Sequence, residues 1–348
     1  MTPPVGPVKL SLMIPTFRSA DTVERTLRSV LAQRHRPLEV LVYDEASADG
    51  TREIVERVLA TADPSIETRF LTSDENSGPV LAWRVALHAI TGDWCTFVWA
   101  DDVLHPTFSE AMAAAASRAA AAGRKIAGCS GEVEAGGRTT PYYAVDRGVV
   151  TAVEYSEGIF LRRFPLTQIC AVYETATART VFDRHVRFEN PRGYDYNRHP
   201  YGNDVGYLSE LAMAGGGIEL VGERLVTLVD SGTSMTRRGT REHLWQMRWQ
   251  YTYAFRRVWG EWRERGVPDA ARLVSMADRR LALCSLLLGP ARERLKVWTA
   301  PAAVRAYLDF RRLDYQLKQT SLEEHRRIVR KRRLVPAGIA SGPNPSSR

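Results

Sequence analysis

Short apolar runs alternate with amphipathic segments along the first hundred residues of the chain. The runs predict strands at four places: residues 10–14, 38–43, 66–71 and 97–100. Between them, apolar side chains recur at helical spacing, as at Val23, Leu27 and Val30. Strands that alternate with helices in this way are typical of an α/β domain on a mostly parallel sheet.

Polar residues follow three of these predicted strands directly. Asp44 and Glu45 come after the second, Asn76 lies just beyond the third, and Asp101 and Asp102 come after the fourth. Ligands of open α/β sheets bind beyond the carboxyl ends of the strands. If the strands are parallel neighbours, these side chains share one edge of the sheet, which is where we expect a binding site.

The adjacent carboxylates Asp101 and Asp102 close the fourth apolar run. Burial of two like charges is costly unless a cation or several hydrogen-bond donors neutralise them. A divalent cation held by one or two carboxylates keeps positions that substrate phosphates can fill. Two alternatives stay open at this point: Asp102 caps the helix predicted from near Pro106, or Asp101 opens a turn.

The last third of the chain is predicted to be helical from about residue 243 onward. One apolar stripe includes Tyr251, Phe255 and Trp262, and a second includes Trp245, Trp249 and Trp259. A helix that is apolar on two sides packs against two partners. We expect it between the α/β part and helices near residues 270–288 and 304–317. The alternatives are tryptophans that stack on acceptor sugars or anchor the chain at a bilayer.

Composition adds bounds on compartment and size. The 348 residues suffice for a large core and for two units. No stretch approaches the roughly 20 apolar residues of a membrane span, and no basic-then-apolar leader starts the sequence, so we expect a cytoplasmic protein. The four cysteines are widely spaced, which favours small buried side chains over a zinc site or disulfides.

The formal net charge of +8 indicates an anionic partner: a nucleotide, an anionic acceptor or the inner leaflet of a membrane. Much of this charge falls within residues 326–333, at the end of the predicted helices. Peripheral contact with the inner membrane face through this basic end is a further expectation. We expect no nucleic-acid partner, and a homodimer could form through the C-terminal helices.

Several short motifs occur in the order that one family uses. A strand ends in Pro-Thr at residues 12–16, residues 44–51 are Asp-Glu-Ala-Ser-Ala-Asp-Gly-Thr, and residues 76–78 are Asn-Ser-Gly. The Asp101–Asp102 pair follows, and later Asn203-Asp204 precedes an apolar helical stretch. In these motifs about the first two thirds of the chain resemble the family 2 glycosyltransferases. Trp99 stands where that family commonly has a further acidic residue.

The resemblance implies a GT-A fold, which is a Rossmann-like α/β domain, here followed by a C-terminal helical subdomain. It implies a domain over residues 1–238, with a nucleotide-binding half at about 8–105 and an acceptor-binding half at about 106–238. Residues 239–335 are then the helical region, and residues 336–348 a disordered tail.

The resemblance also implies the site residues. Asp102 is expected to bind Mn²⁺ or Mg²⁺, and Asp204 to act as the catalytic base. The nucleotide is expected to contact seven residues: Pro15, Thr16, Asp44, Glu45, Asn76, Arg84 and Asp101. Two arginines flank a Gly/Ser/Thr segment and are weaker candidates for diphosphate contacts: Arg237 and Arg238.

The function that follows from the resemblance is transfer of a sugar from a nucleoside-diphosphate donor, UDP- or dTDP-linked, to an acceptor hydroxyl. A single displacement assisted by one base inverts the anomeric carbon. Two alternatives are a non-catalytic relative that binds sugar nucleotides and a nucleotidyltransferase. The second usually has a Gly-rich phosphate loop after the first strand, and residues 15–18, Pro-Thr-Phe-Arg, are not such a loop.

Overall fold

The computed structural model of the chain describes residues 7–143, 145–185, 190–198, 200–230, 241–288 and 308. The contacts divide the chain into one compact unit over residues 1–307 and a second over 308–348. The fold described below is that of the first unit. The domain boundaries expected from the sequence stay predictions.

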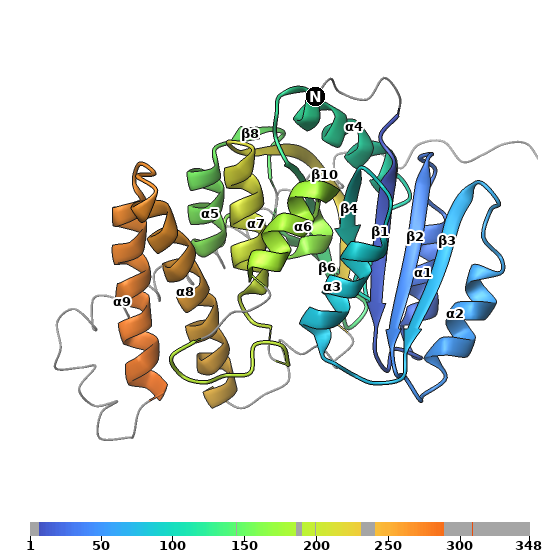
Figure 1. Cartoon of the computed structure of the whole chain (residues 1–348), viewed down its shortest axis with the longest axis horizontal. Helices are drawn as coiled ribbons and strands as arrows, with labels where there is room; N and C mark the ends of the chain where they lie inside the picture. Colours follow the sequence, from blue (N-terminus) through green and yellow to red (C-terminus); the bar gives the residue numbers. More distant parts are fainter. Residues whose placement is uncertain are drawn as a thin grey trace, which may run out of the picture. The chain divides into compact units, whose positions relative to one another are not determined.

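Ten strands of the described residues form one sheet in the order β3-β2-β1-β4-β9-β6-β10-β5, with β7 beside β6 and β8 beside β10 (Figure 1). Their bounds are β1 Leu10–Thr16, β2 Leu38–Glu45, β3 Ile66–Ser73, β4 Trp94–Phe97, β5 Val103–Leu104, β6 Ile126–Ala135, β7 Arg138–Tyr142, β8 Gly148–Val150, β9 Ala171–Glu174 and β10 Ile218–Val229. Strands β3, β2, β1 and β4 are parallel neighbours, as predicted. Beyond β4 the expectation of a mostly parallel sheet is wrong, because only the β6–β10 pairing is parallel there.

Helices cover both faces of this sheet (Figure 1). Their bounds are α1 Val23–Leu31, α2 Thr51–Leu59, α3 Pro79–Ala89, α4 Phe108–Ala121, α5 Ala152–Phe160, α6 Thr175–His185, α7 Asn203–Ala214, α8 Arg241–Glu264 and α9 Ala270–Leu288, with a 3₁₀ helix η1 at Gln168–Cys170. Alternation along β2 sets the two faces, since successive side chains of a strand point to opposite sides. Leu41 packs in one core with α3, whereas Val40 and Val42 pack in the other with α1, α2 and α4.

The segment after β4 differs from the expectation at one point. The strand ends at Phe97, and Asp101 and Asp102 lie in a turn whose Asp102 N–H donates to the Trp99 carbonyl at 3.0 Å. Helix α4 begins at Phe108 with Thr107 as its N-cap residue. The alternative that Asp102 caps this helix is therefore wrong.

Helix α8 packs against two partners, as its two apolar stripes predict. Trp262 is fully buried in the core that includes α7, and Trp245 and Trp249 pack with Cys284 of α9. The assignment of Trp259 to the second stripe is wrong, because its side chain is buried in the same core as Trp262. Of the helix expected near residues 304–317, only Leu308 lies within the described residues.

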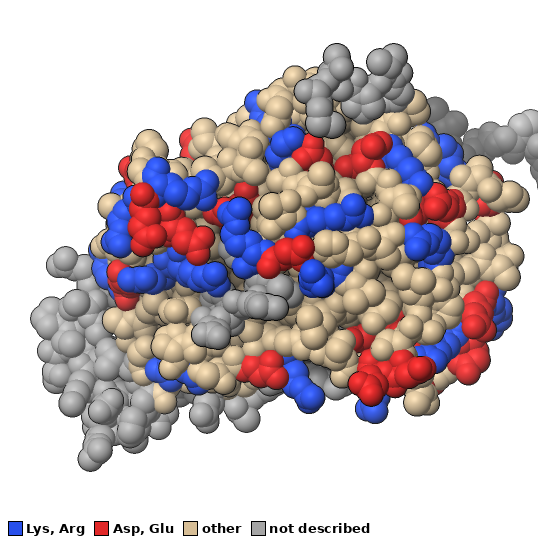
Figure 2. Space-filling view, in the orientation of Figure 1, with Lys and Arg blue, Asp and Glu red and all other residues tan. Residues whose placement is uncertain are grey.

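All four cysteines are free and buried, as predicted from their spacing. Within the described ranges, none of the helices combines the length and apolar character needed to cross a membrane. Figure 2 shows basic and acidic side chains interspersed on one face of the molecule. The basic run at residues 326–333 lies outside the described residues.

Candidate active site

Four strands bring their carboxyl ends to one edge of the sheet, as predicted. In register, Thr16 of β1 lies beside Asp44 of β2, which lies beside Thr72 of β3. Beyond β4, the Val98 N–H donates to the Met13 carbonyl of β1 at 2.7 Å, which carries the pairing toward the Asp101–Asp102 turn. The residues expected to bind a nucleotide from these strand ends therefore share one edge.

The Asp44 carboxylate is completely buried and is neutralised by the protein itself. The Arg52 guanidinium donates to its Oδ2 at 2.8 Å, and the Ser47 N–H donates to the same oxygen at 3.1 Å. The Thr16 hydroxyl donates to Oδ1 at 3.0 Å. With an opposite charge and three donors, this buried carboxylate needs no ligand to balance it.

Glu45 points to the opposite face of the sheet from Asp44, because the two are successive residues of β2. Its Oε1 accepts from the Ser77 N–H at 3.0 Å and from the Ser77 hydroxyl at 2.6 Å. Asn76 uses its own Oδ1 to accept from the Gly78 N–H at 3.0 Å, which shapes the turn before α3. Glu45 therefore keeps Oε2 without a partner among the described residues.

The Asp101–Asp102 turn has almost no neutralisation from the described protein. Asp102 is 5% exposed, and its Oδ1 accepts a single bond, from the Val229 N–H at 3.0 Å. Burial raises the pKa of Asp102 well above its usual value, and the neighbouring Asp101 charge raises it further. Burial also raises the pKa of Asp101. No Lys, Arg or His of the described ranges pairs with either carboxylate.

Asp204 lies in the first turn of α7, on the other half of the sheet. Gly202 precedes this helix with φ +99°, and a Cβ there would come within 2.9 Å of the Ala254 side chain, so glycine lets α7 start close against α8. The Gln168 side-chain N–H donates to Asp204 Oδ1 at 2.7 Å. Burial raises the pKa of Asp204 to about 6, and the Gln168 bond lowers it only in part.

Aromatic side chains from four segments lie within electrostatic range of Asp204. Burial is the main cause of their raised pKa values, and the Asp204 charge adds to it in each case. The four are Tyr142, Tyr155, Tyr196 and Tyr251. All four stay neutral at neutral pH, so none of them neutralises Asp204.

Four expected site residues remain. The structure describes two of them, Pro15 and Arg84. Pro15 lies within β1, beside Tyr43 of β2. Arg84 is exposed on α3, where its Nε donates to Asp183 Oδ1 at 2.7 Å. Arg237 and Arg238 lie outside the described residues.

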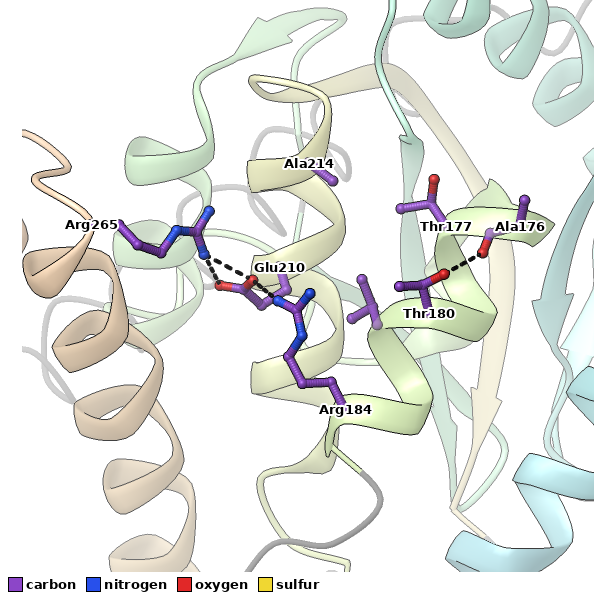
Figure 3. Close-up of a pocket in the computed structure, with 8 residues that line it drawn as sticks. Ala176, Thr177, Thr180, Arg184, Glu210, Ala214 and Arg265 are labelled. Atoms are coloured by element: carbon purple, nitrogen blue, oxygen red, sulfur yellow. Dashed lines mark hydrogen bonds and ion pairs between the residues drawn. The ribbon is translucent and has the colours of Figure 1, made fainter.

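A cavity of about 370 Å³ lies apart from these residues, between α6, α7 and the end of α8. In Figure 3, Arg184 and Arg265 point toward Glu210 from two sides. Their N–H groups lie 3.4 and 3.2 Å from Glu210 Oε2, and Trp262 also donates to this carboxylate. None of the residues predicted from the sequence lines this cavity.

A model of the family described as "Glycosyl transferase family 2" matches residues 11–185, which is half of the 348-residue chain. This match covers β1, β2, the Asp101–Asp102 turn and η1. The chain belongs to glycosyl transferase family 2. The expected family is thereby confirmed.

Among relatives of this family 2 chain, the succinoglycan biosynthesis protein ExoO of Rhizobium meliloti is 35% identical over 118 residues, 34% of this chain and 32% of that protein. A GalNAc(5)-diNAcBac-PP-undecaprenol beta-1,3-glucosyltransferase of Campylobacter jejuni is 32% identical over 96 residues, 28% of this chain and 30% of that protein. The matches thus span about a third of these relatives' length.

Among solved structures, S. aureus TarS 1–349 in complex with UDP-GlcNAc aligns with a TM-score of 0.57 at 18% identity, over 88% of this chain and 81% of TarS 1–349. The likeness establishes the fold. The GT-A fold expected from the motifs is confirmed.

Three residues of the site carry no clear signal in the sequence of this family 2 chain. Arg52 lies eight residues after Asp44, but one arginine among many is not distinctive. Ser77 is a common serine in a loop, and Gln168 is a lone glutamine at the start of η1. Their partners become evident only when the chain is folded. Their roles depend on contacts across 32 and 36 residues.

Proposed function

We propose that this family 2 chain is an inverting glycosyltransferase that moves a sugar from a nucleoside-diphosphate donor, UDP- or dTDP-linked, to an acceptor hydroxyl. Relatives named for succinoglycan biosynthesis and for glucosyl transfer to a lipid-linked saccharide support sugar transfer. The UDP-GlcNAc bound by TarS, which has the same fold, supports a uridine nucleotide as donor.

The observation that carries the proposal is the Asp101–Asp102 turn. It lies at the carboxyl edge of the sheet, where ligands of α/β sheets bind, and Asp102 is buried with one backbone donor and no cationic partner among the described residues. Hard oxygen donors with raised pKa values fit Mn²⁺ or Mg²⁺. A cation held there would neutralise the charge that develops on the departing diphosphate.

The two carboxylates of β2 are proposed to bind the nucleoside differently. Asp44 is occupied by Arg52, Thr16 and Ser47, so it shapes the pocket from within. Glu45 keeps one carboxylate oxygen for a ligand N–H, such as the imide N–H of uracil or thymine. This favours Glu45 over Asp44 for the base contact.

Asp204 is proposed to accept the proton of the attacking acceptor hydroxyl. A carboxyl with a pKa of about 6 is largely ionised at pH 7.5, and it is a stronger base than an exposed aspartate. Gln168 holds one of its oxygens, so the other can face the acceptor. One base and one displacement give inversion at the anomeric carbon.

Incubation with UDP-GlcNAc and MnCl₂, followed by NMR of the sugar product and by UDP release, tests the proposal. We expect UDP release that depends on Mn²⁺ and is lost in Asp204→Asn, with an inverted anomeric configuration in the product. A panel of UDP- and dTDP-sugars extends the same assay. Nucleotide binding with no turnover for any donor would favour a non-catalytic relative, and release of pyrophosphate would favour a nucleotidyltransferase.

A further inference from the structure

Two side-chain hydrogen bonds connect the Asp101–Asp102 turn to Asp204. The Trp99 indole N–H donates to the Thr167 hydroxyl at 3.1 Å. The next residue, Gln168, donates through its side-chain amide to Asp204 Oδ1 at 2.7 Å. Thr167 is 9% exposed and Gln168 is completely buried, and both bonds are partly shielded from water.

Both ends of this connection are held firmly. The Trp99 ring is stacked on Phe97, with ring centroids 5.9 Å apart, and Trp83 packs against it at 5.1 Å. The Trp99 carbonyl also accepts the Asp102 N–H at 3.0 Å, so this residue fixes the turn itself. On the other side, the Gln168 carbonyl accepts from the Thr96 hydroxyl of β4 at 3.1 Å.

We propose that Trp99, Thr167 and Gln168 are positioning residues that hold Asp204 at a fixed place relative to the Asp101–Asp102 turn. This inference rests on the proposed function. There the Asp101–Asp102 turn acts on the leaving diphosphate, and Asp204 acts on the attacking hydroxyl of the same displacement. A misplacement of about 1 Å between reacting groups can lower the rate about a hundredfold. The two partly buried hydrogen bonds, joined through the backbone between Thr167 and Gln168, oppose such a displacement.

The chemical type of the donor at Asp204 supports this role. An arginine, as at Asp44, would hold the carboxylate but would also make it a weak base. The neutral amide of Gln168 holds it while burial keeps the pKa raised. The other amide atom, Oε1, is buried without a partner among the described residues, so the amide is oriented for Asp204 at a cost in stability.

The other titratable groups around Asp204 do not compete with this control. They are tyrosines from β7, α5, the segment before α7, and α8: Tyr142, Tyr155, Tyr196 and Tyr251. Each is neutral across the range in which Asp204 titrates. The Arg257 guanidinium also lies within electrostatic range of Tyr196. A change at Gln168 should therefore move the titration of Asp204 and leave these tyrosines neutral.

The test compares Gln168→Met, which keeps the side-chain length but removes the N–H, with the parent enzyme. The rate of UDP-GlcNAc hydrolysis with MnCl₂ is measured between pH 4.5 and 9. We expect its acid limb to move upward by about one pH unit, because a donor to the ionised form is lost. The titration of the Asp204 carboxyl carbon by NMR, assigned by its absence in Asp204→Asn, should move equally without any need for turnover.

Two further variants test the other half of the bridge. Trp99→Phe and Thr167→Val each remove one bond and keep the apolar packing. We expect each to lower kcat about tenfold, with the donor KM and the acid limb unchanged, because distance and not charge is altered. Trp249→Phe is the matched control, since its indole N–H donates to the Ser285 hydroxyl at 3.1 Å in the helical region; it should leave kcat unchanged.

Unchanged acid limb and unchanged Asp204 titration in Gln168→Met would overturn the role of Gln168, even if Asp204→Asn abolishes turnover and the proposed function stands. Should Gln168→Met not fold, Gln168→Leu gives the same comparison. Rates of Trp99→Phe and Thr167→Val equal to that of Trp249→Phe would overturn the bridge. Full turnover in Asp204→Asn would instead reject the proposed function, and this inference with it.

Discussion

Asp44 lies near the end of β2 and Asp102 follows β4, the two strands that flank β1, and both side chains are buried, yet their partners differ. The Asp44 carboxylate accepts hydrogen bonds from the Arg52 guanidinium, the Thr16 hydroxyl and the Ser47 N–H. Asp102 receives one backbone N–H and lies beside a second carboxylate. The first is stabilised as an ion within the fold, whereas the second is destabilised as an ion until something else binds.

This contrast separates carboxylates that build the fold from those available to a ligand. Glu210 belongs with Asp44, because Arg184, Arg265 and Trp262 all contact it. Asp204 belongs with Asp102, since one neutral amide is its only side-chain donor among the described residues. This difference is the basis for the proposal that Asp102 binds a metal ion and that Asp204 accepts a proton.

Replacement of the base should give the largest effect. In Asp204→Asn we expect the transfer rate to fall by about a thousandfold, in the range that general-base groups contribute. The affinity for UDP should be unchanged, because Asp204 is proposed to contact the acceptor and not the nucleotide. Steady-state rates together with UDP calorimetry on the same preparation check both parts. A variant that loses affinity and rate together would place Asp204 in the donor pocket instead.

Replacement of the Asp102 carboxylate should give the second-largest effect. Asp102→Asn is expected to lower the affinity for Mn²⁺ more than about a hundredfold, since even groups that only orient metal ligands contribute ten- to a hundredfold. The activity of the parent should vanish with EDTA and return with MnCl₂, while the variant responds to neither. If the parent keeps its activity in EDTA, Asp102 does not bind a metal ion that the reaction needs.

Asp44→Asn should destabilise the fold. The change leaves Arg52 without its partner, and loss of one member of a buried ion pair costs about 3 kcal/mol, with less expected here because Arg52 is partly exposed. Urea unfolding at pH 7.5 measures the change in the free energy of unfolding. Arg52→Gln is the matched variant and should lose stability as well, because it leaves the Asp44 charge buried.

Asp204→Asn should raise the free energy of unfolding at neutral and alkaline pH, whereas Asp44→Asn lowers it. The folded pKa of Asp204, about 6, lies above the unfolded value of 3.8, so the folded state loses stability as pH rises between about 4 and 6. Removal of the carboxyl should therefore stabilise the protein by up to about 3 kcal/mol at pH 8. The gain should disappear at pH 4. Urea unfolding at the two pH values checks this, and a variant less stable than the parent at pH 8 would contradict it.

Much of the first half of the fold could be predicted from the sequence, because its signals are local. Period-two and helical patterns located β1 to β3 and their helices, and the polar residues after them marked the edge of the sheet. The strand predicted at residues 97–100 lies at Trp94–Phe97 in the structure, because Trp99 and Ala100 are apolar but belong to the turn that leads to Asp102. The antiparallel strands beyond β4 escaped prediction, because their pairing joins segments far apart in the chain.

The site was predictable only as far as it lies in motifs. Asp101, Asp102 and Asp204 are adjacent to recognisable patterns, and their roles stay predictions. Nothing local in the sequence distinguishes Asp44, which has a cation, from Asp102, which has none. That difference arises where α2 places Arg52 and β10 places only a backbone N–H, and it required the fold.

The central claim is that the Asp101–Asp102 turn binds a divalent cation together with the donor diphosphate. Calorimetry of UDP binding with and without MnCl₂, on the parent and on Asp102→Asn, tests it most directly. The account predicts tight binding by the parent only with Mn²⁺, and weak binding by the variant that Mn²⁺ does not improve. Equal affinity for UDP in the parent with and without Mn²⁺ would contradict it.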